Sequence, residues 1–153
     1  SSAASDVYKR QIPKIKISEN TAKITNPHYK KLYRFYDNES GKALADELCV
    51  YDETIDSTKP HTIFDPDAIW KTKTLTDYTA RELHVTVFKN GELVYKQPSL
   101  YEIRIYCAEQ LETLWDEVKR FENPHTYYVD LSKKLWDIKN ALLEKSKDGK
   151  DLK

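Results

Sequence analysis

The chain has 153 residues, with 25 basic and 25 acidic side chains and a formal net charge of zero. This length is typical of one domain. The balanced charge argues against nucleic acid or a membrane surface as a partner, because both attract proteins with an excess of basic residues. No apolar stretch approaches the roughly 20 residues needed to span a bilayer, so we expect no nucleic acid and no membrane partner.

Residues 1–11 match the translated reading frame of a common transposon-based sequencing adapter. We interpret them as a non-native leader and exclude them from fold reasoning. On this interpretation the native part begins at Ile12, and the sequence that precedes it in the gene is missing.

Alternation of apolar and polar residues predicts strands in the first two thirds of the chain. These strands are expected at residues 12–18, 31–36, 42–51, 70–78, 81–89 and 93–95. Residues 37–41 and Asn90-Gly91 predict hairpin turns, and a slip in the alternation near Asp46 predicts a β-bulge or the end of strand pairing. Residues 52–69, which contain two prolines, are expected to form a loop.

The pattern changes to a helical period after residue 97. Ser99 and Glu102 have the spacing of a capping box, and an apolar stripe continues from there to Phe121. A second helix is expected from about Asp130 to residue 146, followed by a polar tail at residues 147–153. Strands first and helices last predict an α+β fold, with mostly antiparallel strands and hairpins followed by a C-terminal helical hairpin packed on the sheet.

The residues by themselves indicate no catalytic or metal site. The three glycines are too dispersed to form a phosphate-binding loop, and Cys49 and Cys107 are too far apart for a zinc motif. Cys107 falls on the apolar stripe, so we expect it to be buried in a reducing compartment. The four histidines have no catalytic partner at a recognisable spacing; they are His28, His61, His84 and His125.

Bases and aromatic residues alternate over residues 28–36. This pattern has two interpretations: a stacking platform for single-stranded nucleic acid, or a strand with a buried aromatic face and a solvated basic face. The zero net charge favours the strand, because a nucleic-acid site normally has a wider basic surround.

Three separated blocks resemble the C-terminal part of bacterial nicotinate phosphoribosyltransferase. The blocks are residues 14–20 with 23–27 and 30–34, then 98–104, and then 114–125 with 127–136. Their order and spacing agree with the family over about residues 12–143. One departure is His28 after Pro27, where the family usually has Gly, a residue that adopts positive φ more easily.

The resemblance implies a fragment of a larger α/β-barrel enzyme of NAD salvage. Residues 12–29 would be the end of the barrel segment and its connection, 30–97 a β-rich accessory domain, and 98–146 two C-terminal helices. The parent enzyme would be cytoplasmic, with a homodimer as its candidate assembly, and would join nicotinate to phosphoribosyl pyrophosphate with ATP hydrolysis and Mg²⁺. No cofactor is expected in this fragment itself, which would be inactive alone and partner the barrel domain of the same protein.

No catalytic residue transfers from the family, because none of the four histidines falls in a matching motif. Polar side chains at the end of a barrel segment can reach phosphates, and this makes Lys16, Ser18 and Lys23 the candidates for substrate binding. The alternative for these residues is that they anchor the barrel to the accessory sheet. The alternative for the whole chain is a free-standing interaction module without catalysis.

Overall fold

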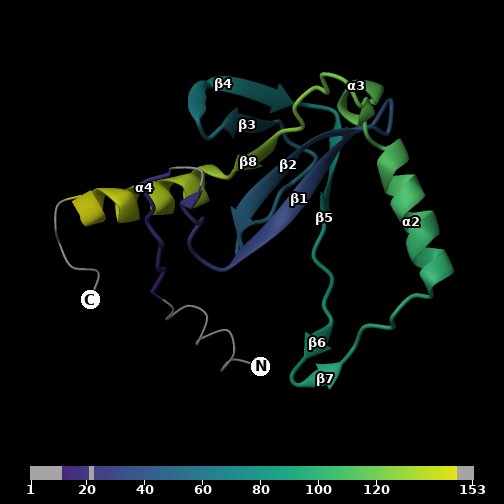
Figure 1. Ribbon diagram of the computed structural model, residues 1–153, viewed down its shortest axis with the longest axis horizontal. Helices are drawn as coiled ribbons and strands as arrows, with labels where there is room; N and C mark the ends of the chain where they lie inside the picture. Colours follow the sequence, from purple (N-terminus) through teal and green to yellow (C-terminus); the bar gives the residue numbers. More distant parts are fainter. Residues whose placement is uncertain (1–11, 21–22, 148–153) are drawn as a thin grey trace.

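The computed structural model describes residues 12–20 and 23–147, so the leader at residues 1–11 and most of the polar tail lie outside the described residues. The fold is α+β, as predicted, with one four-stranded sheet and two small hairpins (Figure 1). The main sheet has the strand order β5-β1-β2-β8, in which β8 alone is parallel to its neighbour. Its strands are β1 (Lys30–Asp37), β2 (Ala43–Val50), β5 (Tyr78–Glu82) and β8 (Val129–Leu131).

The β1–β2 hairpin forms where the alternation predicted it. Gly41 takes a φ of +67° at the end of the turn, and the Asp37 carboxylate accepts a hydrogen bond of 2.8 Å from the Ser40 backbone. The register shifts between Phe35, which pairs with Ala45, and Tyr36, which pairs with Ala43. The bulge therefore lies at Leu44, two residues before the predicted position.

A second hairpin pairs β3 (His61–Asp65) antiparallel with β4 (Ala68–Leu75). Strand β4 overlaps the strand expected at 70–78, although it begins earlier and ends at Leu75. Strand β3 was missed, so the expectation of a loop across 52–69 is wrong for the second half of that range; β3 is five residues long and only Ile63 in it is buried, which gives no apolar alternation. Hairpin β3–β4 joins the core through Ile63 and Leu75, which are both buried.

Two predicted strands are not formed as expected. Residues 12–18 have no regular secondary structure, because alternation alone does not provide a neighbouring strand to pair with. The strand expected at 81–89 ends at Glu82, and only β6 (Phe88–Lys89) resumes pairing, with β7 (Glu92–Leu93). The turn between them is confirmed: Asn90 and Gly91 both have positive φ, at 52° and 84°, as a two-residue hairpin turn requires.

The helices differ from the expected pair. Helix α2 (Leu100–Glu112) begins at the predicted capping box of Ser99 and Glu102, but it ends nine residues before Phe121, and the short α3 (Asp116–Lys119) follows. Helix α4 (Lys133–Lys147) begins after the unpredicted β8. Figure 1 shows α2 and α4 on opposite sides of the sheet, so they do not form a helical hairpin.

Only one of the long helices packs on the sheet. Leu135 of α4 is fully buried against Val50 and Leu131. Helix α2 has no buried residue, and Cys107 is therefore exposed, which makes the expectation of a buried Cys107 wrong. The helical period of apolar residues predicts that the helix has an apolar face. It does not predict whether another part of the described structure packs on that face.

Candidate functional site

The candidates Lys16, Ser18 and Lys23 lie on the irregular segment before β1. Lys16 and Lys23 are exposed, and Ser18 is half-buried. The segment folds back on itself through Lys16, whose backbone N–H donates to the Thr25 hydroxyl at 3.1 Å. The structure does not bring these three side chains together with any of the histidines, and none of them lines the main cavity described below.

The connection into β1 is held by Lys30. Its ammonium donates to three successive backbone carbonyls, of Asn26, Pro27 and His28, at 2.9, 3.3 and 2.6 Å. Burial lowers the pKa of Lys30. His28 adopts a φ of +76°, so this chain keeps the left-handed turn conformation even though it has no glycine there.

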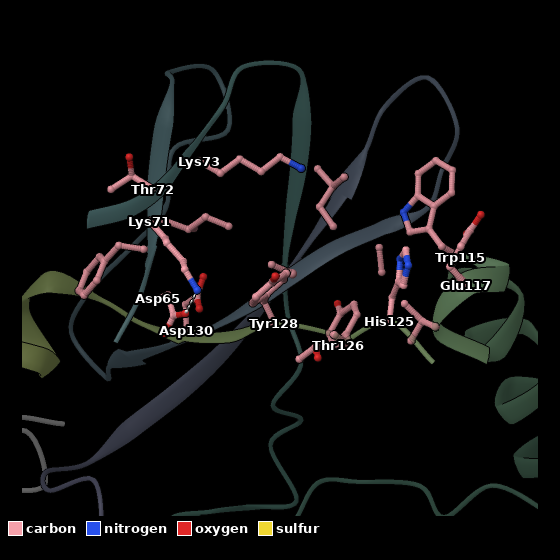
Figure 2. Close-up of a pocket in the computed structure, with 17 residues that line it drawn as sticks. Asp65, Lys71, Thr72, Lys73, Trp115, Glu117, His125, Thr126, Tyr128 and Asp130 are labelled. Carbon is pink, nitrogen blue, oxygen red and sulfur yellow. Dashed lines mark ion pairs between the residues drawn. The ribbon is translucent and has the colours of Figure 1, made fainter. Parts of the chain in front are cut away.

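The main cavity lies between the sheet and hairpin β3–β4 (Figure 2). It has a volume of about 630 Å³, within the range of small-molecule sites. Residues 43–45 of β2 line it, together with 63–65 and 71–73 of the hairpin and parts of the stretch from Trp115 to Asp130. None of these positions was a candidate from the sequence.

One end of this cavity is acidic. Asp130 of β8 is only 4% exposed, and within the part of the chain that the structure describes its carboxylate makes no hydrogen bond and no ion pair. Figure 2 shows it beside Asp65 and Lys71, whose side chains form an ion pair of 3.9 Å. Burial, and then the nearby charges of Asp65 and Glu47, raise the pKa of Asp130 to about 6.

His61 at the start of β3 is half-buried against the core. Its Nε2 is 2.9 Å from a carboxylate oxygen of Glu47, which is almost fully buried. The imidazole stacks on Phe35, with 5.2 Å between ring centroids. A buried carboxylate needs a partner to offset its lost hydration, and His61 is that partner for Glu47.

A charged network fixes the other wall of the cavity. The Arg34 guanidinium donates two hydrogen bonds to the buried Asp46, at 2.8 and 2.9 Å, and the Tyr127 hydroxyl donates to the same carboxylate at 2.8 Å. The bond to Asp46 raises the pKa of Arg34, and burial raises the pKa of Tyr127. This network ties the segment before β8 to the β1–β2 hairpin.

The same contacts account for the cations of residues 28–36. Tyr33 and Phe35 are buried, which confirms the predicted aromatic face. The predicted basic face is not simply solvated: Lys31 is buried on the aromatic face and lies 3.8 Å from Glu82, and Arg34 is bound to Asp46. These cations are engaged in contacts within the fold.

Neither a close glycine cradle for phosphate nor a cluster of metal-ligating side chains is found among the described residues. Gly41 and Gly91 sit in open hairpin turns, where an added Cβ would meet nothing within 4 Å, so neither forms a close cradle for phosphate. In residues 12–20 and 23–147, no group of three or more His, Cys, Asp or Glu side chains is arranged to hold a metal ion. Over the same residues, no helix is long and apolar enough to cross a membrane.

Sequence reasoning missed Asp130, the most unusual side chain of the cavity. The available signal was an acid placed between Val129 and Leu131, two apolar neighbours in a predicted helix start. Such an acid was consistent with a first helical turn, where carboxylates are favourable. The strand assignment of residues 129–131 is what turns Asp130 toward the cavity.

Comparisons with known proteins agree with one another. Residues 29–139 match the family described as "Nicotinate phosphoribosyltransferase C-terminal domain". The chain is 35% identical over 130 residues to the nicotinate phosphoribosyltransferase of Bacillus subtilis (strain 168), covering 85% of this chain and 26% of that protein. It is 32% identical over 149 residues to the Dictyostelium discoideum protein of the same name, covering 92% of this chain and 25% of that protein.

The fold is similar as well. A crystal structure of human nicotinic acid phosphoribosyltransferase superimposes with a TM-score of 0.70 at 26% sequence identity, covering 78% of this chain and 24% of the human chain. The chain thus spans about a quarter of the length of the curated relatives that it matches.

Proposed function

The chain belongs to the nicotinate phosphoribosyltransferase C-terminal domain family, and from this premise we propose that it is the C-terminal portion of an enzyme that makes nicotinate mononucleotide. The parent enzyme joins nicotinate to phosphoribosyl pyrophosphate, coupled to ATP hydrolysis, in the salvage route to NAD. The observation that carries the proposal is the match over residues 29–139, in a chain that spans only a quarter of the related enzymes.

The domain's role in that enzyme is structural. Helix α2 supports this role, because it exposes apolar side chains that no part of the described fold covers. The largest exposed fractions are those of Leu100 and Tyr101, at 75% and 72%. Contiguous apolar surface of this kind marks an interaction site, and its partner is the barrel domain of the same protein, in a cytoplasmic and homodimeric enzyme. In this proposal ATP and Mg²⁺ bind to the barrel domain, and the open hairpin turns of Gly41 and Gly91, which form no close cradle for phosphate, support that placement.

Residues 12–29 are the connection from the barrel, and Lys16, Ser18 and Lys23 are the positions nearest the substrate phosphates. Their half-buried or exposed side chains leave them accessible to such a ligand. Replacing Ser18 with Ala in an active parent enzyme raises the KM for phosphoribosyl pyrophosphate if this placement is right. An unchanged KM assigns the three residues to anchoring instead.

A fusion tests the proposed function. The upstream three quarters of the Bacillus subtilis relative, joined to residues 12–153 of this chain, is expected to form nicotinate mononucleotide, whereas this chain alone forms none. The control is the same upstream part carrying its own C-terminal segment. A folded fusion that stays inactive beside an active control, or product formed by this chain alone, would contradict the proposal.

A further inference from the structure

The acidic end of the main cavity holds a carboxylate that is not paired with a protein group in residues 12–20 and 23–147. Asp130 as a whole residue is 4% exposed, and its carboxylate oxygens are not among the fully buried side-chain atoms that lack a partner, so they face the open space of the cavity. Its neighbours add negative charge: Asp65 faces it from β3, and Glu47 is its register partner in β2. The nearby basic side chains pair with other acids: the His61 imidazole with Glu47 at 2.9 Å, and the Lys71 ammonium with Asp65 at 3.9 Å.

The size and lining of the cavity limit which cation could pair with the Asp130 carboxylate. The acids are not arranged to hold a metal ion. The cavity, at about 630 Å³, is far larger than an inorganic ion. Phe64 and Tyr128 line the cavity, and Figure 2 shows Tyr128 between the acids and Trp115, which lies at the other end. A flat cation with dispersed charge suits such walls, because it pairs with carboxylates bidentately and stacks on aromatic rings.

We propose that this cavity is a binding site for a guanidinium or amidinium group, which pairs with the Asp130 carboxylate while the body of the ligand lies along the aromatic wall. Its test measures direct binding to this chain, so it does not depend on the proposed enzyme activity. The expected pH dependence follows from the raised pKa of Asp130, about 6. Protonation removes the partner of the ligand, so affinity falls about tenfold between pH 7 and pH 5.

The test uses the 153-residue chain and the fluorescent probe 4-aminobenzamidine, with 4-aminobenzamide as its uncharged counterpart. We expect saturable binding of the amidine and at least tenfold weaker binding of the amide. Asp130→Asn is expected to weaken amidine binding at least tenfold and to flatten its pH dependence. The matched control is Asp137→Asn, which removes an exposed acid of α4 outside the cavity and leaves binding unchanged.

Two further measurements keep the result interpretable. Lys71→Gln removes the cation that competes at the acidic end, so it is expected to tighten binding severalfold even if Asp130→Asn fails to fold. Competition by capped arginine shows where the natural guanidinium group comes from. If capped arginine displaces the probe as well as unlabelled benzamidine does, the ligand is an arginine side chain of a protein. If it displaces the probe only weakly, the ligand is a free small molecule. No saturable amidine binding, or binding equal in wild type and folded Asp130→Asn, would overturn the proposal.

Discussion

His28 shows how one residue carries a conformational cost in this fold. Its φ of +76° lies in the region that L-residues other than glycine avoid, and the turn is held there by three hydrogen bonds from Lys30 to backbone carbonyls. The surrounding contacts therefore impose a backbone conformation that the side chain disfavours.

Replacing His28 with Gly is expected to give a fold about 1 kcal/mol more stable than His28→Ala, because only glycine relieves the positive-φ strain. Both variants lose the hydrogen bond of 2.9 Å from the Tyr29 N–H to Nδ1 of His28, so the comparison between them isolates the backbone strain. The free energy of unfolding in urea measures the difference. A His28→Gly protein no more stable than His28→Ala would refute this account.

Single residues also show what the sequence can and cannot predict. The turn residues Gly41 and Asn90-Gly91 were identifiable because their conformational preferences are local. Asp130 was not, because its burial depends on a cavity formed by β2, the β3–β4 hairpin and a segment far along the chain. The exposure of Cys107 was missed for the same reason, since a helical period reveals a face but not its cover.

At the scale of elements, α4 is anchored by side chains at its start. Ser132, the residue before the helix, accepts a hydrogen bond of 3.2 Å from the Leu135 N–H. Its hydroxyl also donates to a Glu53 carboxylate oxygen at 2.7 Å, and that oxygen accepts from the Val50 N–H at 2.6 Å. The helix start is thereby joined to the end of β2, beside the buried Leu135.

Ser132→Ala is expected to lower the free energy of unfolding by about 1–2 kcal/mol, because it removes the cap and leaves Glu53 without one of its donors. Chemical denaturation measures the loss. Ser146→Ala is a matched control on the same helix: its hydroxyl donates to the Leu143 carbonyl at 2.8 Å near the helix end, and its removal should cost about 0.5 kcal/mol or less. If the two variants lose the same free energy of unfolding, the Ser132 cap does not stabilise the helix more than an ordinary surface hydroxyl does.

Elements were predictable where local signals agreed with tertiary pairing. The β1–β2 hairpin combined alternation with a strong turn, and α2 had a capping box. Residues 12–18 had the same alternation as β1 but no partner in the described structure, so they formed no strand. Strand β8 is only three residues long and pairs in parallel with β2, which leaves no hairpin signal in the sequence.

At the scale of the whole molecule, the fold divides into a packed part and an uncovered one. The sheet, hairpin β3–β4 and α4 share two apolar clusters, while α2 and hairpin β6–β7 extend away from them (Figure 1). Such an arrangement is expected of a domain whose remaining contacts belong to a larger protein, and in isolation the uncovered face should drive self-association.

Charging the exposed face of α2 tests this consequence. Leu100→Lys with Ile103→Lys places two cations where the side chains are 75% and 44% exposed, so we expect little change in unfolding free energy, within about 0.5 kcal/mol. Sedimentation velocity at several concentrations should show several times less associated protein than in wild type. Glu109→Gln alters charge on the same helix without altering its apolar face, so it should associate as wild type does. If the doubly charged chain still associates, the associating surface lies outside α2. If Glu109→Gln reduces association as much as the double substitution does, net charge rather than the apolar face of α2 controls association.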